Sequence, residues 1–209
     1  MTSAPEHRAI KPSVLYYGTP VSLISTMNPD GTPNLSPMSS SWALGNRIVL
    51  GMATNGCGFL NIERTMECVI NMPSPEIWKQ VERIAATTGV SPVPDYKVAM
   101  GYRFEPRKFE CAGLTPIMSA VVVPPRVAEC PLQFEARVLA IHHVTPVEGD
   151  GPVPVAMIET RVERVHAHES IVIPGSNHID TSRWSPLFYV FRHYFGLGNE
   201  LGTNYRVEV

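Results

Sequence analysis

The sequence has no excess of either charge. Seventeen Lys and Arg residues stand against nineteen Asp and Glu residues, so the formal net charge at pH 7 is −2. This balance does not indicate nucleic acid or an anionic membrane as a partner. Charged residues form only 17% of the 209 residues, against roughly 25% in typical soluble domains. The shortage predicts that part of the surface is buried against another chain, and we expect an oligomer.

Long apolar runs and paired-cysteine motifs are also missing. No stretch approaches the roughly 18 apolar residues of a membrane-spanning helix, and the N-terminal MTSAPEHRAIKPS has no apolar segment typical of a secretory signal. The cysteines contain no C-x-x-C pair, and we interpret them as free thiols in preference to disulfides or metal ligands. These features predict a cytoplasmic protein without a membrane partner. The four cysteines are Cys57, Cys68, Cys111 and Cys130.

Proline, in contrast, is abundant. The chain holds 20 prolines, roughly twice the usual share. Proline breaks helix interiors and is tolerated at strand edges, bends and loops, so this content argues against a helical bundle. An apolar content of 44% is enough for one sizeable core. We therefore expect one domain over residues 1–209, built mainly from strands.

Short alternating segments favour antiparallel strands. Residues 131–145 alternate apolar and polar side chains, and residues 153–168 are predicted to pair with them across the turn at 148–151. Two segments, 59–65 and 76–87, instead have apolar residues at helical spacing, whereas 91–125 is predicted to be irregular. Seven or so strands with two or more inserted helices indicate a small β-barrel. Further strands are expected at 21–26, 47–53 and 67–71.

Two polar segments follow predicted strands and are the main candidates for a binding site. The turn Asn28–Gly31 leads into a strand that ends in serines, Ser39–Trp42, and the next strand ends in the small-residue loop Thr54–Gly58. A helix is predicted after that loop, and free N–H groups at a helix start attract anions such as phosphate. The serine hydroxyls suit the polar edge of a flat heterocycle. Together the two segments predict a ligand with a ring and a phosphate.

Two other patterns give weaker hypotheses. Gly196–Gly202 is similar to a dinucleotide fingerprint, but it has an extra residue and no strand–helix–strand unit around it, so we interpret it as a loop. His166 and His168 share a strand face and raise the alternative of a metal-dependent hydrolase, together with His142, His143, His178 and His193. The usual ligand spacing is missing, so we expect no metal site. His166 is instead predicted to line a pocket.

Several ordered segments resemble the flavin reductase-like family of FMN-binding split barrels. They are PVSLISTMNPDGTPNLSPMSSSW, NIERTMECVINMPS, KFECAGLTPIMSAVVVPPRVAECPLQFEARV and VERVHAHESIV. The match runs from about residue 13 to about residue 195. The resemblance implies an FMN-binding split β-barrel, a homodimer, and hydride transfer from NADH or NADPH to flavin, with reduced flavin supplied to a partner monooxygenase. The alternative within this cofactor class is a non-enzymatic FMN electron carrier.

The resemblance also implies roles for individual residues. The serine-rich strand end would lie beside the isoalloxazine ring and the small-residue loop would hold the phosphate, with His166 near the flavin. The loop lacks the basic residue that relatives often carry there, so either Arg64, Arg183 or Arg192 would supply the charge or the phosphate would bind more weakly. The aromatic stretch SPLFYVFRHYFGLG would line the flavin or the dimer surface. The flavin-binding residues implied are Ser39, Ser40, Ser41, Trp42, Thr54, Asn55, Gly56, Cys57, Gly58 and Asn61.

Overall fold

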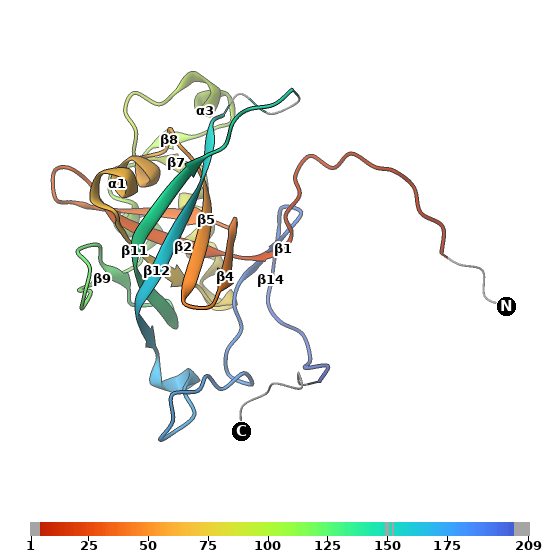
Figure 1. Cartoon of the computed structure of the whole chain (residues 1–209), viewed down its shortest axis with the longest axis vertical. Coiled ribbons are helices and arrows are strands. Elements are labelled where there is room, and N and C mark those ends of the chain that lie inside the picture. The colour runs from red at the N-terminus through yellow and green to blue at the C-terminus, as the bar shows by residue number, and fades with distance from the viewer. Residues whose placement is uncertain (1–4, 149–150, 152, 203–209) are drawn as a thin grey trace.

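The computed structural model describes residues 5–148, 151 and 153–202, and strands dominate it (Figure 1). The main sheet has seven strands in the order β3-β2-β6-β11-β12-β5-β4, and every neighbouring pair is antiparallel. These strands are β2 (Ser22–Met27), β3 (Pro33–Met38), β4 (Ser41–Leu44), β5 (Arg47–Ala53), β6 (Glu67–Met72), β11 (Leu132–His143) and β12 (Val155–Ala167).

The remaining elements are short. The helices are α1 (Cys57–Thr65), η1 (Pro75–Ile77), α2 (Trp78–Ala85), α3 (Asp95–Ala99), α4 (Lys108–Ala112) and η2 (Glu169–Ile171). A second sheet joins β1 (Tyr17–Pro20) to the hairpin of β13 (Phe188–Val190) and β14 (His193–Phe195). Two-stranded pairs are formed by β7 (Thr87–Thr88) with β8 (Arg103–Phe104) and by β9 (Pro116–Ile117) with β10 (Arg126–Val127). No helix in the described part of the chain is long and apolar enough to cross a membrane.

The main sheet curls until its two edge strands meet at the serine-rich turn. β3 and β4 are joined by Ser39 and Ser40, and the N–H of Gly51 on β5 donates to the carbonyl of Ser40 at 2.7 Å. Across the same corner, the Ser22 and Ser41 hydroxyls lie 3.4 Å apart. The result is a split β-barrel with inserted helices, which confirms the predicted fold class.

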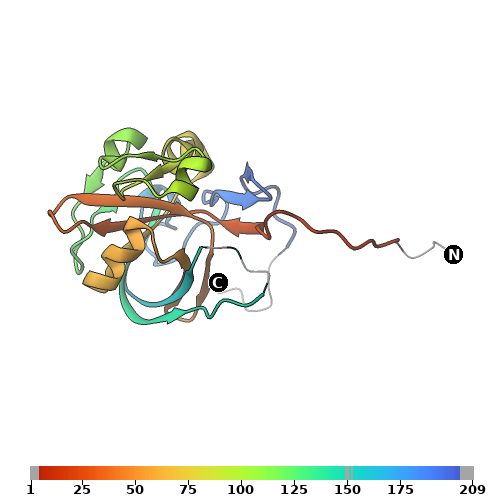
Figure 2. The same cartoon turned by 90° about the horizontal axis from the view of Figure 1, so that it is seen from above.

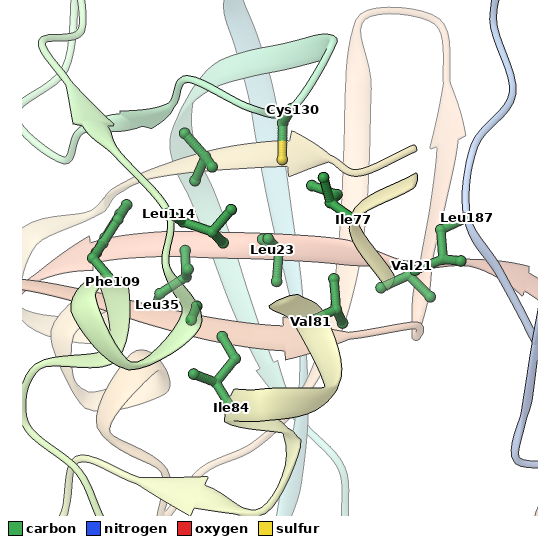
Figure 3. Packing of buried hydrophobic residues seen from close by; sticks show 12 residues of the cluster. Val21, Leu23, Leu35, Ile77, Val81, Ile84, Phe109, Leu114, Cys130 and Leu187 are labelled. Carbon is green, nitrogen blue, oxygen red and sulfur yellow. The ribbon is translucent and has the colours of Figure 1, made fainter. Parts of the chain in front are cut away.

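Two hydrophobic cores lie on opposite faces of this sheet. Successive residues of a strand point to opposite faces, so on β2 Leu23 enters one core and Ile24 the other. The inner core fills the barrel, and Phe59 and Ile62 of α1 close it. The outer core packs Val81 and other side chains of α2 and α4 against β2 and β3 (Figure 3). Figure 2 shows the yellow and green segment with these helices over one side of β2 and β3, opposite the curved β11 and β12.

The predicted elements are largely confirmed, with two corrections. β11 and β12 pair along their length, and α1 covers the predicted helix 59–65. The prediction of a helix over 76–87 is wrong at its end, because α2 stops at Ala85 and the β-branched pair Thr87–Thr88 bonds to β8 as a short parallel strand. The stretch 91–125 also contains α3 and α4, which were not predicted. The predicted turn at 148–151 lies partly outside the described residues.

Candidate functional site

A cavity of about 520 Å³ opens between the serine-rich corner of the barrel, the start of α1 and the face of α2. Segments far apart in the sequence form its walls, including the residues on either side of β1, α3, α4 and the β13–β14 hairpin. Its volume lies within the range of about 300–1,000 Å³ that is typical of ligand pockets. The predicted flavin-binding residues that line it are Ser39, Ser40, Gly56, Cys57 and Gly58.

The start of α1 gives the cavity free backbone N–H groups. Gly56 is the N-cap, in extended conformation, and no side chain caps the helix. The first N–H groups of a helix have no intrahelical partner and carry partial positive charge. Gly58 packs so closely on β3 that a Cβ atom there would lie 2.6 Å from the Ser36 hydroxyl. Glycine at this position therefore lets α1 approach the cavity wall.

The Asn61 side chain connects the start of α1 to β2 and to the turn before β3. It is 2% exposed, and its amide donates to the Thr26 hydroxyl at 3.1 Å and to the Asn28 side-chain oxygen at 2.8 Å. The Cys57 thiol contacts the same Asn28 oxygen at 3.2 Å. Burial raises the pKa of Cys57, so the thiol is neutral at pH 7. The turn before β3 and the loop before α1 are thus joined into one polar unit.

Two lysines supply positive charge to the same part of the cavity. Lys108, the first residue of α4, is only 4% exposed, yet no carboxylate forms an ion pair with it among the described residues. Burial lowers the pKa of Lys108 to about 8. Lys97 of α3 also lines the cavity, and burial lowers its pKa. Both lysines act electrostatically on Cys57, so they lie near the start of α1.

The other side of the cavity is aromatic. Tyr16 before β1, Tyr189 on β13 and Tyr194 on β14 line it, together with Glu82 of α2. The Ser40 hydroxyl donates to the Tyr16 hydroxyl at 3.1 Å, which joins the serine-rich corner to this wall. Figure 1 shows β1 and β14 on the side of the barrel away from α1. The cavity therefore has cations and free N–H groups toward α1 and aromatic rings with a carboxylate toward the C-terminal hairpin.

The other predicted flavin-binding residues lie outside this lining. Ser41 and Trp42 are on β4, and Trp42 is 57% exposed. The Thr54 N–H donates to the Pro154 carbonyl at 2.9 Å, which fixes the base of the loop. The side-chain oxygen of Asn55 is buried without a hydrogen-bond partner. None of these four residues is among those that line the cavity, and their contact with a flavin stays a prediction.

His166 is not among the residues that line this cavity, and its position relative to a bound flavin stays a prediction. Its Nε2 lies 2.6 Å from Glu135 Oε1 across the β11–β12 pair. Glu135 is completely buried and also accepts bonds from the N–H groups of Ala120, Val121 and Val122. Burial by itself would raise the pKa of Glu135, but these hydrogen bonds outweigh it and the pKa is lowered. In this chain His166 therefore holds the 119–125 loop through Glu135.

The arginines suggested as the source of phosphate-binding charge do not line the cavity either. The Arg64 guanidinium donates to the Met27 carbonyl on the surface, and Arg183 pairs with Asp180 at 3.3 Å. Arg192 lies in the β13–β14 turn and borders a separate hollow with Trp78. No group of three His, Cys, Asp or Glu side chains suited to a metal occurs in the described part of the chain, and no disulfide is formed there.

Sequence reasoning missed the lysines and most of the tyrosines. Lys108 stands inside KFECAG, a segment that carries the family resemblance, so that motif was the available signal. Lys97 lies in the stretch that was predicted to be irregular. Tyr189 and Tyr194 belong to the C-terminal aromatic segment, of which a role at the flavin or dimer surface was expected.

Fold and site together define a split-barrel protein with a cavity at the open corner of the barrel, lined by two lysines and the uncapped start of a helix. A model of the flavin reductase-like domain family matches residues 14–198. The chain belongs to the flavin reductase-like family.

The chain is also similar to individual proteins. The chain is 48% identical over 201 residues to the uncharacterized protein YdfE of Bacillus subtilis, covering 96% of this chain and 94% of the relative. Among solved structures it is similar to flavoredoxin of Desulfovibrio vulgaris, with a TM-score of 0.76, 18% identity and coverage of 96% and 98% of the two chains. It is also similar to nitrilotriacetate monooxygenase component B of Bacillus cereus, with a TM-score of 0.72, 18% identity and coverage of 97% and 98%. At this identity the two structures show the fold alone.

Proposed function

We propose that the protein is an FMN-binding oxidoreductase that transfers hydride from NADH or NADPH to flavin. The observation that carries the proposal is Lys108, a buried ammonium with no carboxylate in ion-pair contact in the described chain, next to the uncapped start of α1. A buried charge without a partner is costly. An anionic ligand that enters the cavity would remove that cost.

FMN fits the residues that are present. Its phosphate would bind the N–H groups at the start of α1 and the ammonium of Lys108, with Lys97 nearby. The polar edge of its ring would bind Ser39 and Ser40 at the corner of the barrel. The flavin supplies the redox chemistry, and the protein positions it and tunes its electronics. Donors near the N1–C2 edge would favour the reduced form, because reduction adds negative charge there.

The proposed assembly and cell context follow from the same family. We propose a cytoplasmic homodimer, since the charged fraction is low and apolar side chains on the outer face of the barrel are exposed. The similar fold of a monooxygenase component supports a partner monooxygenase that receives reduced flavin. No residue of the cavity needs to act as an acid or base in the hydride step.

The experiment is a flavin titration followed by turnover. Purified protein with FMN should show bands near about 370 and 450 nm, the transitions of oxidised flavin. Riboflavin, which lacks the phosphate, should bind at least about tenfold more weakly, equivalent to about 1.4 kcal/mol. FAD should rank between them, because its adenylate must fit at the mouth of the cavity. NADH or NADPH should then be oxidised at a steady rate with added FMN.

Two outcomes would contradict the proposal. Equal affinity for FMN and riboflavin would show that the α1 loop does not bind phosphate. Tightly bound flavin without nicotinamide oxidation would indicate an electron carrier and not a reductase.

A further inference from the structure

Three tyrosines from distant segments form one continuous wall of the cavity. The ring centroids of Tyr16 and Tyr189 are 5.5 Å apart in an edge-to-face arrangement, and those of Tyr189 and Tyr194 are also 5.5 Å apart. Each ring is only partly buried and lines the cavity. The pairing of β1 with β13 and of β13 with β14 fixes their positions, since Tyr189 lies directly opposite Tyr194 in the hairpin. We call Tyr16, Tyr189 and Tyr194 the tyrosine wall.

The carboxylate of Glu82 lies beside the tyrosine wall. The Tyr194 hydroxyl donates to Glu82 Oε2 at 2.9 Å, which holds the acid over the cavity. Burial and the neighbouring Glu82 raise the pKa of Tyr194, so this hydroxyl keeps its proton and continues to donate. Arg192 in the β13–β14 turn borders the separate hollow beside Trp78 and also acts electrostatically on Tyr189. Among the charged residues that line the cavity, Lys97 and Lys108 lie toward α1 and Glu82 lies at the tyrosine wall.

The combination of aromatic faces and a carboxylate selects a particular ligand chemistry. The faces of aromatic rings carry negative electrostatic potential and attract cations or electron-poor rings. The carboxylate strengthens that attraction and repels anions. A phosphate would therefore be unfavourable here, whereas it is favourable at the α1 end. The two ends of the cavity suit different parts of the bound reactants.

We propose that the tyrosine wall and Glu82 form a subsite for a positively charged heteroaromatic ring, the oxidised nicotinamide ring of the electron donor. This assignment rests on the proposed function. In the reaction the C4–H bond of the dihydronicotinamide breaks, its electron pair leaves with the hydrogen as hydride to the flavin, and the donor ring becomes a pyridinium cation. The subsite interacts more strongly with that cation than with the neutral dihydro ring. An interaction that grows along the reaction lowers the barrier to hydride transfer.

The test uses three probes that share one ring and differ in charge. The FMN-loaded protein is titrated with 1-methylnicotinamide, a cation, with nicotinamide, which is neutral, and with nicotinate, an anion. We expect the cation to bind at least tenfold more tightly than the anion, with the neutral ring between them. Glu82→Gln should remove most of the preference for the cation and leave the affinity for the neutral ring unchanged. Tyr189→Leu should lower the affinities for the cation and for the neutral ring several-fold.

A matched control separates the subsite from a general loss of negative charge. Glu110→Gln removes an exposed acid of α4 that does not line the cavity, and it should leave all three affinities unchanged. FMN affinity is measured in every variant and should stay within a factor of about three of the wild type. Circular dichroism of each variant confirms that it is folded.

Three results would overturn the assignment. The first is equal affinity of the FMN-loaded wild type for the three probes, and the second is an unchanged cation preference in Glu82→Gln. The third is competition of the probes with FMN for the flavin-free protein, which would mean that the wall holds the flavin ring itself. If FMN fails to bind the wild type at all, the proposed function fails and this subsite fails with it. If FMN binds and the probes do not discriminate, only the subsite fails.

Discussion

Lys108 lowers the stability of the flavin-free protein and, in the proposed function, contributes to FMN binding. Its ammonium is buried without a carboxylate in ion-pair contact in the described chain, and its pKa is lowered to about 8 from an ordinary value of 10.5. A shift of this size means that the folded environment disfavours the charged form, relative to the neutral amine, by about 3 kcal/mol more than water does. At pH 7 the lysine is charged in the folded and the unfolded protein, so the folded state carries the cost. Residues that destabilise a fold in this way are common at binding sites.

Lys108→Met should therefore stabilise the flavin-free protein at pH 7, by up to about 3 kcal/mol. The same variant should bind FMN at least about tenfold more weakly, because the phosphate loses a charge-assisted bond. Urea unfolding of the flavin-free proteins and FMN titration measure the two effects. Lys11→Met, which changes an exposed lysine that does not line the cavity, should alter neither quantity. A variant that is less stable and binds FMN normally would assign Lys108 to packing.

The lowered pKa of Lys108 also predicts a pH dependence. Between about pH 8 and 10.5 the unfolded state binds more protons than the folded state, so the stability of flavin-free wild type rises with pH and the advantage of Lys108→Met disappears. FMN needs the protonated lysine, so its affinity should fall above about pH 8, approaching tenfold per pH unit. The charged and titratable groups that act on Lys108 are Cys57, Lys97, Glu105 and Cys111.

Riboflavin is the control for this pH profile, because it lacks the phosphate. Its affinity should change little over the range in which FMN affinity falls. Parallel losses for both ligands above pH 8 would show that the whole cavity changes and would remove the specific role of Lys108.

At the scale of elements, the start of α1 is the feature on which phosphate binding depends. Gly56 has φ −94° and ψ 147°, a conformation open to any residue, and a Cβ atom there would meet only the Ala53 carbonyl, at 3.5 Å. A side chain at Gly56 can therefore be added without breaking the helix. Gly58 is different, because its Cβ position is filled by Ser36.

Gly56→Glu should block FMN binding through both the volume and the charge of the new side chain, while the barrel stays folded. Gly56→Gln has the same volume without the charge, and Gly56→Ala adds only a methyl group. We expect FMN affinity to fall in the order Ala, Gln, Glu, with a loss of at least about tenfold for Glu relative to Gln. Isothermal titration gives the affinities, and thermal unfolding checks the fold. If all three variants bind FMN as the wild type does, the loop is only a turn.

At the scale of the whole molecule, exposed apolar side chains indicate a second subunit. β4 and β12 both pair with β5, and they expose Trp42, Leu44 and Met157 to 57%, 70% and 48%. The segment before β1 runs outward from the barrel (Figure 1) and exposes Leu15 to 74%. Apolar patches of this kind commonly mark protein interfaces. An obligate dimer typically buries more than about 2,000 Å² in total.

We expect a homodimer at micromolar concentration, and Trp42→Glu should shift it toward monomer. A charge in the centre of an apolar interface loses its hydration without a partner, which costs several kcal/mol. Analytical ultracentrifugation measures the shift. Val123→Glu adds the same charge at a site that is 72% exposed on another loop, and it should leave the dimer intact. A monomeric wild type would contradict this prediction.

The sequence by itself determined the features that depend on neighbouring residues. Alternation in residues 131–145 and 153–168 specified β11 and β12, because the side-chain period of a strand is a local property. The spacing of apolar residues after Gly58 likewise specified α1. The small-residue loop and the serine-rich strand end were found as candidates because each is a contiguous segment. That they face one cavity followed from the order of the strands.

The tertiary structure alone decided which side chains complete the site. Lys108 is 51 positions beyond Cys57 in the sequence, and its burial without an ion-pair partner among the described residues arises only when α4 packs against α2 and β3. Tyr16 and Tyr189 meet through the pairing of β1 with β13. The contact of His166 with the buried Glu135 likewise arises only from the pairing of β11 with β12. Desolvation and cross-strand partners are set by residues far away in the chain, so no local pattern contains them.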